Sequence, residues 1–203
     1  MDNKVIVLAA SLGGPPLVND ILSGLKTGFE LPILVLQQME SDFSEPLTAA
    51  WSKTTAVNMI RLVDTEILQS GCAYVLPYCT YPEFSTNAGR VEMKSQAVNA
   101  SGHVSEQWSL VVENCLKQFG DQMILVLLTG LKQVQGKFNS VLEKVKQAGG
   151  TIIVCRESES LNSENNEMDI IGGQQIMSID MIVNHLQKYV GATEQTPSNI
   201  YSR

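Results

Sequence analysis

Three apolar runs of the chain are each followed by a polar residue that could take part in chemistry. Ser11 comes directly after KVIVLAA, Gln38 after PILVLQ, and Thr129 after MILVLL. A serine on a tight turn between a strand and a helix is placed as a nucleophile, with glycines that let a substrate approach and helix N–H groups that stabilise an oxyanion. The alternative is that Ser11 only caps the following helix or shapes the turn. The motif SLGGPP alone favours that alternative.

Other kinds of chemical site find little support. SLGGPP lacks the Lys-Ser/Thr pair of a Walker sequence and the spacing of G-x-G-x-x-G, so it is not a phosphate loop. The cysteines Cys72, Cys79, Cys115 and Cys155 show no C-x-x-C spacing, and three of them lie in apolar stretches. Reduced thiols are common in such stretches. We therefore expect no metal site, no disulfide framework and no cofactor.

The elements that must position the three polar residues alternate along the chain. Short β-rich runs are separated by amphipathic segments of helical length, which predicts an α/β fold with a mostly parallel, doubly wound sheet flanked by helices. Short alternating runs at 72–77, 82–86 and 90–94 predict a β-hairpin inserted into this pattern. Ligands of open α/β sheets bind beyond the carboxyl ends of the strands. Ser11 and Gln38 are therefore expected at one edge of the sheet.

The predicted element boundaries follow from apolar periodicity and from glycine and proline breaks. Besides the hairpin, we expect strands at 4–10, 32–37, 59–63, 123–129 and 151–155. We expect helices at 43–54, 108–119 and 137–148, one more after the Gly13–Pro16 break, and a last one capped by Ser178.

Length and composition limit the class of protein. The chain has 203 residues, of which 44% are hydrophobic and 17% charged, so we expect one globular domain over 1–190 and a flexible tail over 191–203. A net charge of −7 opposes binding to nucleic acid or to an anionic membrane. The longest apolar run is too short to insert into a membrane, and no secretory signal is seen, which predicts a cytoplasmic protein. The acidic segment 156–169 is expected to be a solvated loop.

Five segments, taken in order, resemble the catalytic domain of chemotaxis receptor protein-glutamate methylesterases. VIVLAASLGGPP, LVLQQM, GCAYVLPY, AVN and VLLTGL are similar to the family segments GAS-x-GG, QHM, G-x-AY-x-AP-G-D, AVN and ILTGMG-x-DG. The resemblance extends over about residues 4–190. It implies the methylesterase-domain fold, a degenerate stand-alone member of the family, and a chemoreceptor or another signalling protein as the partner.

The resemblance also implies a Ser-His-Asp triad, of which this sequence keeps one member. Ser11 matches the nucleophile, Gln38 stands at the histidine position, and Val134 lies nearest the aspartate position. A glutamine side chain stays neutral and cannot accept a proton as imidazole does. Efficient ester hydrolysis is therefore not expected.

The remaining site predictions concern the cleft and a replacement base. The positions that the resemblance places at the oxyanion hole and cleft are Leu12, Met39, Thr129, Gly130 and Leu131. His103 follows the AVN segment and is a candidate substitute base, although a solvated loop histidine is the favoured interpretation. His185, in the last predicted helix, is interpreted as a structural or surface residue.

Three functions are consistent with these residues. The first is a methylesterase-like domain that has lost most catalysis and serves as a binding or regulatory module, a pseudoenzyme, in a bacterial chemotaxis-type signalling system. The alternative is an active serine esterase that hydrolyses receptor glutamate methyl esters with Ser11 and a substitute base. The third is an unrelated small-ligand binder on the same α/β frame, because a fold does not fix a function.

Overall fold

One parallel sheet organises the protein. The computed structural model describes residues 4–38, 42–98, 104–134, 137–156 and 175–189. Within them, seven strands pair in the order β10-β9-β8-β1-β2-β5-β3, and every neighbouring pair is parallel. The strands are β1 (Val5–Ala10), β2 (Ile33–Gln37), β3 (Asn58–Arg61), β5 (Cys72–Val75), β8 (Met123–Leu127), β9 (Thr151–Cys155) and β10 (Gln175–Met177). The predicted α/β class is confirmed.

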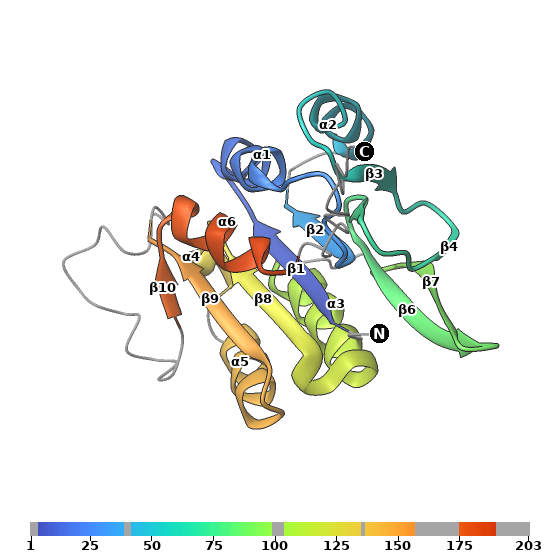
Figure 1. Ribbon diagram of the computed structural model, residues 1–203. Helices are drawn as coiled ribbons and strands as arrows, with labels where there is room; N and C mark the ends of the chain where they lie inside the picture. The colour runs from blue at the N-terminus through green and yellow to red at the C-terminus, as the bar shows by residue number, and fades with distance from the viewer. Residues whose placement is uncertain (1–3, 39–41, 99–103, 135–136, 157–174, 190–203) are drawn as a thin grey trace, which may run out of the picture.

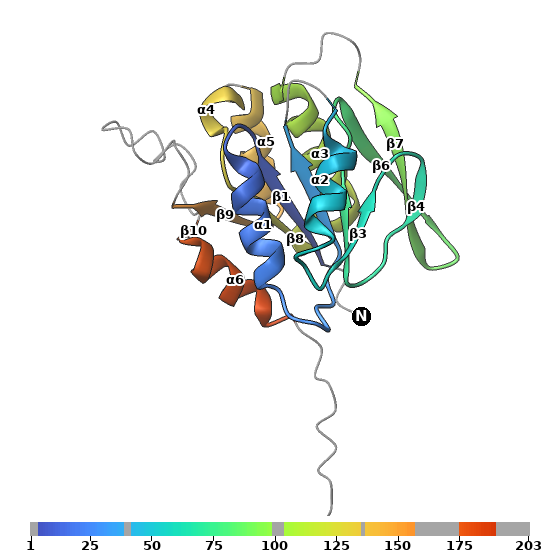
Figure 2. The ribbon, with the colours of Figure 1, turned by 90° about the horizontal axis from the view of Figure 1, so that it is seen from above.

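Helices cover both faces of this sheet, as Figures 1 and 2 show from two directions. Because both faces are covered, the central strands β1, β2 and β8 are buried at every residue and are apolar along almost their whole length. The helices on one face are α1 (Gly14–Gly24), α2 (Ser44–Trp51) and α6 (Ile179–Gln187). The helices on the other are α3 (Val104–Phe119), the short η1 (Gly120–Gln122), α4 (Leu131–Val134) and α5 (Lys137–Gln147).

The two apolar cores follow the alternation of side chains along each strand. In β1, Val5, Val7 and Ala9 belong to the core beneath α3 and α5, and the residues between them belong to the core beneath α1 and α6. The core beneath α3 is the larger of the two and includes the edge-on ring pair Trp108 and Phe138, whose centroids are 5.5 Å apart. The same alternation shows on which face of the sheet a polar residue at the end of a strand lies.

A smaller antiparallel sheet stands beside the main one (Figure 1), with the order β4-β7-β6. Its strands are β4 (Thr65–Ile67), β6 (Thr80–Asn87) and β7 (Arg90–Ala97). The predicted hairpin is present as β6 and β7, joined by Ala88 and Gly89 with φ of 49° and 76°. Two left-handed residues are what a two-residue hairpin turn requires.

Several sequence expectations need adjustment. The run at 72–77 does not join the hairpin: its first four residues form β5, buried within the parallel sheet, because their apolar side chains need cover on both faces. The third predicted strand ends at Arg61, and Val63 beyond it is 56% exposed. Strands β4 and β10 were not predicted, since three residues are too few to show a period.

Two other expectations, the cap of the last helix and the burial of three cysteines, agree with the structure. The Ser178 hydroxyl accepts a hydrogen bond from the Met181 N–H at 3.4 Å and so caps α6. Cys72, Cys115 and Cys155 are buried, and burial raises the pKa of the Cys115 thiol. Within the described part of the chain, no helix is long and apolar enough to cross a membrane. Most of the predicted acidic loop and the predicted tail lie outside the described residues.

Strand β1 lies between β2 and β8. The chain after β1 first adds β2, β3 and β5 on one side of it, and later adds β8, β9 and β10 on the other. This is the point at which ligands bind in open α/β sheets, just beyond the carboxyl ends of the strands. The three polar residues singled out in the sequence follow these three strands.

Candidate functional site

Backbone pairing brings Ser11, Gln38 and Thr129 together at the carboxyl edge of the sheet. The Ser11 N–H donates to the Thr129 hydroxyl oxygen at 2.9 Å, and the Gln38 N–H donates to the Ala10 carbonyl at 2.7 Å. The Gln38 bond continues the parallel register of β1 and β2 beyond their last paired residues, and the Ser11 bond adds a side-chain contact beyond the end of β8. The serine therefore has the ends of both neighbouring strands beside it.

Close approach of the β8 end to the β1 end depends on Gly130. Its φ is 86°, in the left-handed region, and a Cβ built on it would lie 2.4 Å from the Ser11 Cβ. A side chain at this position would therefore push Ser11 away from Thr129. The sequence motif TGL places the one residue without a Cβ where the two strand ends touch.

Gln37 ties the ends of β1 and β2 together, a role that the sequence analysis missed. Its side-chain Nε2 donates to the Ser11 carbonyl at 2.8 Å and to the Gln38 carbonyl at 3.0 Å. Its Oε1 lies against Gly14, where a Cβ would come within 2.6 Å of it. Helix α1 can start this close to the sheet only because Gly14 has no side chain.

The turn after Ser11 starts α1 through the backbone. Gly13, with φ of 76°, is the N-cap residue and makes no side-chain capping bond, while the Gly14 N–H donates to the Ser11 carbonyl at 2.9 Å. Ser11 thus shapes the turn with its carbonyl oxygen, and its hydroxyl is not the helix cap. Pro15 and Pro16 occupy the first helical turn, where a missing N–H costs nothing.

The residues at this edge are covered, although the resemblance places a cleft there. Ser11 is 4% exposed, Gln38 8% and Thr129 3%, and Leu131 is also buried. Close packing of the Gly130 backbone on the Ser11 side chain accounts for part of this burial. The neighbouring Leu12 is 73% exposed and points away from the core.

The Gln38 side chain has an unpartnered acceptor. Among the described residues no donor reaches its buried Oε1. The residues two positions before Ser11, Gln38 and Thr129 all belong to the core beneath α3. They are Ala9, Leu36 and Leu127. Alternation therefore places the side chains of all three residues on the same face of the sheet.

Val134 is at the end of α4 and is 1% exposed within the core beneath α3. The position that the resemblance pairs with an aspartate is thus apolar and packed, and a valine cannot orient a base. His103 and Met39 lie outside the described residues. Among the residues that are described, no group of three or more His, Cys, Asp or Glu side chains is arranged to hold a metal ion.

His185 lies far from Ser11. Gln187, two residues after His185, donates its side-chain amide to the carbonyl of Gly24, the last residue of α1. Ser11 lies before the other end of the same helix. A helix of this length spans about 15 Å. Burial, and then the charge of Lys188, lower the pKa of His185, and its ring nitrogen lies 3.2 Å from the Lys188 ammonium. These contacts agree with a structural or surface role.

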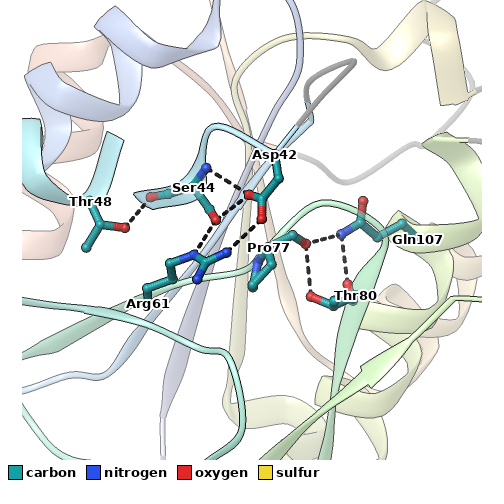
Figure 3. A network of polar contacts seen from close by, with 7 residues as sticks. All are labelled: Asp42, Ser44, Thr48, Arg61, Pro77, Thr80 and Gln107. Atoms are coloured by element: carbon teal, nitrogen blue, oxygen red, sulfur yellow. Dashed lines mark hydrogen bonds and ion pairs between the residues drawn. The ribbon is translucent and has the colours of Figure 1, made fainter. Parts of the chain in front are cut away.

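A second group of polar residues braces the loops beside the site (Figure 3). The Arg61 guanidinium donates to the Ser44 hydroxyl at 2.6 Å and to the Asp42 carboxylate at 2.7 Å, and the Ser44 hydroxyl donates to Asp42 at 2.5 Å. These bonds fix the start of α2 to the end of β3. Burial raises the pKa of Asp42, but the hydrogen bonds from Ser44 and Arg61 outweigh it, so the net direction is down.

Gln107 in α3 braces the turn between β5 and β6. Its Nε2 donates to the Thr80 carbonyl at 2.7 Å and to the Pro77 carbonyl at 3.2 Å, and the Thr80 hydroxyl donates to the same Pro77 oxygen (Figure 3). Gln107 is 4% exposed. The helix predicted at 108–119 begins after Gln107, whereas α3 begins at Val104, so the sequence analysis did not indicate this contact.

The fold and the positions of these strand ends define the class of protein. A family model described as CheB methylesterase matches residues 6–186, and the chain belongs to this family. The crystal structure of the Thermotoga maritima CheB methylesterase catalytic domain has the same fold, with a TM-score of 0.77 and 23% sequence identity, over 92% of this chain and 98% of that chain.

Curated relatives carry the name protein-glutamate methylesterase/protein-glutamine glutaminase. The relative numbered 4 from Geobacter metallireducens is 28% identical over 165 residues, which are 81% of this chain and 46% of the relative. The relative numbered 4 from Myxococcus xanthus is 31% identical, over 77% of this chain and 43% of its own length. The chain spans about half the length of the curated relatives it matches. The resemblance drawn from the sequence is confirmed.

Proposed function

We propose that this chain is a methylesterase-family domain that binds a chemoreceptor or another protein of a chemotaxis-type signalling system without hydrolysing it efficiently. One observation carries the proposal. The residue beside Ser11 at the end of β2, where the resemblance places the catalytic histidine, is Gln38, whose N–H is bonded to the last carbonyl of β1. The frame of the family's site is present, and its base is replaced by a neutral amide.

The chemistry of the two replaced residues supports lost turnover. A serine hydroxyl attacks an ester only when a base takes its proton, and a carboxamide oxygen is far too weak a base at neutral pH. Val134 offers no carboxylate to orient an imported base. Loss of one triad member lowers turnover by about 10⁴. Oxyanion stabilisation alone leaves only a small residual rate.

Exposed apolar side chains at the same edge support a protein partner. Leu12 follows β1 and is 73% exposed, and Phe43, the residue before α2, is 50% exposed. Both side chains are large and stand on loops beyond the carboxyl ends of neighbouring strands. A partner protein that covers these two side chains would remove their apolar surface from water, which favours binding. The names of the relatives state protein-bound glutamate and glutamine as their substrates.

The proposal is tested with the purified chain, a Ser11→Ala variant and the Thermotoga maritima relative as a positive control. Methanol release from a methylated receptor fragment and labelling by a serine-reactive fluorophosphonate are measured. We expect no Ser11-dependent methanol release and no stoichiometric labelling, while the receptor fragment still binds. Turnover in the ordinary enzyme range of about 1 to 10³ s⁻¹ that disappears in Ser11→Ala would overturn the proposal. Loss of that turnover in His103→Ala would identify the base.

A further inference from the structure

The segment that follows β8 closes over the end of β1. A Cβ built on Gly130 would lie 2.4 Å from the Cβ of Ser11 and 3.2 Å from its Oγ, so the Gly130 backbone lies against the Ser11 side chain. Helix α4 begins at the next residue, at the edge of the sheet where β1 ends and α1 starts (Figure 2). With this cover in place Ser11 is 4% exposed. Access to the Ser11 hydroxyl therefore requires the segment to move.

Two side chains hold α4 in place. Leu131 and Val134 are 9% and 1% exposed, and both belong to the core beneath α3. They are three positions apart, so they lie on the same side of the single helical turn. Four residues of helix have no stability of their own, because helices shorter than about 12 residues are marginal in water. The burial of these two side chains therefore decides whether α4 stays closed.

Gly130 gives the segment a hinge. Its φ is 86°, and glycine adopts positive and negative φ about equally readily, so the backbone can rotate there without strain. The residues before it are fixed to β1: the Leu128 N–H donates to the Ala9 carbonyl at 2.9 Å, and the Thr129 hydroxyl accepts from the Ser11 N–H. Rotation about Gly130 would lift α4 and leave the strand ends bonded.

We propose that α4 is a lid over Ser11, which turns about Gly130 and opens without unfolding of the sheet. Segments held by few apolar contacts open locally in this way, at a lower free energy than the rest of a fold. A molecule reaches the Ser11 hydroxyl only in the open state, so its affinity is lowered by the fraction of the protein that is open. The lid does not depend on a catalytic base and is independent of the function proposed above.

Opening is measured with Ser11→Cys in a chain that also carries Cys79→Ser, which removes a partly exposed native thiol. N-ethylmaleimide labels the introduced thiol through the open state. Cys115 is fully buried in the core beneath α3 and reports unfolding of the whole protein. Mass spectrometry separates the two sites. We expect the introduced thiol to be labelled at least about 100-fold faster than Cys115. Its rate should change little in low urea, because local opening exposes little surface.

Two matched variants assign the opening to α4. Val134→Ala removes apolar contacts that hold the lid closed, so labelling of the introduced thiol should become about 10-fold faster. Val145→Ala is the control. Val145 is equally buried in the same core, but it lies against Gly150 just before the start of β9, at the opposite edge of the sheet. This variant should speed the labelling of Cys115 and leave that of the introduced thiol unchanged.

Hydrogen exchange of the Ser11 amide provides the same comparison without the introduced thiol, so the test does not depend on the folding of Ser11→Cys. Val134→Ala should speed this exchange about 10-fold, and Val145→Ala should not. Labelling of both thiols at one rate, with the same urea dependence, would show that α4 opens only with the whole fold and would overturn the proposal. Labelling as fast as in urea-unfolded protein would show that nothing covers Ser11. Equal responses to the two variants would show that the opening does not involve α4.

Discussion

The carboxyl edge of the sheet contains two polar regions that differ in how their groups are used. In the bracing region, the ring of Asp42, Ser44 and Arg61 and the clamp made by Gln107 join side chains to partners at 2.5 to 3.2 Å (Figure 3). In the site region, the buried Oε1 atoms of Gln37 and Gln38 have no donor among the described residues, and Val134 is apolar and buried.

The polar groups of the bracing region stabilise the loops, whereas the site region includes polar groups that make no contribution of this kind. Polar side chains that brace loops are selected to satisfy each other, since a half-satisfied network is costly. The unsatisfied acceptors of Gln37 and Gln38 lie instead at the strand ends beside Ser11. Each of the following experiments would sharpen this contrast or break it.

The largest expected effect is a gain of function in the site region. The double change Gln38→His and Val134→Asp should restore a base and its orienting carboxylate, and raise Ser11-dependent ester hydrolysis about 100-fold or more over the wild type. Either change alone should do much less, because the triad acts as a unit. Hydrolysis is measured beside a triple variant that also carries Ser11→Ala. No gain in a folded double variant would mean that the geometry of the site has changed as well as its chemistry.

Gly130→Ala should strongly destabilise the protein without changing any polar group of the site. The alanine Cβ would meet the Ser11 Cβ and would hold a left-handed φ, so we expect a loss of about 3 kcal/mol in the free energy of unfolding. Gly89→Ala is the control: its φ of 76° is similar, but nothing lies within 4 Å of its Cβ. That variant should lose about 1 kcal/mol. Urea unfolding gives both values, and equal losses would contradict the close contact.

Gln107→Met should cost about 2 kcal/mol, since it removes the side-chain donor that the buried Pro77 carbonyl and the partly buried Thr80 carbonyl share. Gln96→Met, on the exposed sheet, should change the free energy of unfolding by less than about 0.5 kcal/mol. Urea unfolding compares the two variants. A neutral Gln107→Met would show that the bracing bonds are dispensable and would remove the contrast with the site.

The smallest expected effect concerns the Asp42 ring. Its carboxylate has a pKa below the ordinary value of 3.8, so its ionised form is favoured by folding. This contribution is present above that value and is lost as the pH falls through the lower pKa of the folded state. Because Asp42 and Arg61 are partly exposed, Asp42→Asn should cost less than about 1 kcal/mol at pH 7. Thermal unfolding at pH 7 and in acid should show this difference shrinking in acid; a constant difference would argue against the ion pair.

Sequence patterns predicted the fold because its strands are long apolar runs and its turns contain glycine or proline. Ser178 and the Asn87–Arg90 turn could be read directly, since capping and left-handed turns have strong residue preferences. Strands β4 and β10 could not, because their pairing depends on partners distant in the sequence.

At the site, the sequence indicated which strand ends would meet, but not how they are held. The role of Gln37 depends on two carbonyls that only the folded backbone brings within reach. The burial of Ser11 depends on the close approach of Gly130, and the orphan atom of Gln38 on the donors that the fold fails to place beside it. The roles inferred for Ser11, Gln38 and Val134 stay predictions.

The central position of β1 has a consequence for how the chain is made. Ser11 and Thr129, whose backbone and side chain meet at the site, are 118 residues apart in the sequence. At a synthesis rate of about 5 to 20 residues per second, roughly 6 to 24 s pass between the two residues. During this interval β1 can pair with β2 on one side, while its other edge, all apolar, awaits β8. The strand that leads to Ser11 therefore presents an unpaired apolar edge until β8 has been made, and such an edge invites pairing with other chains.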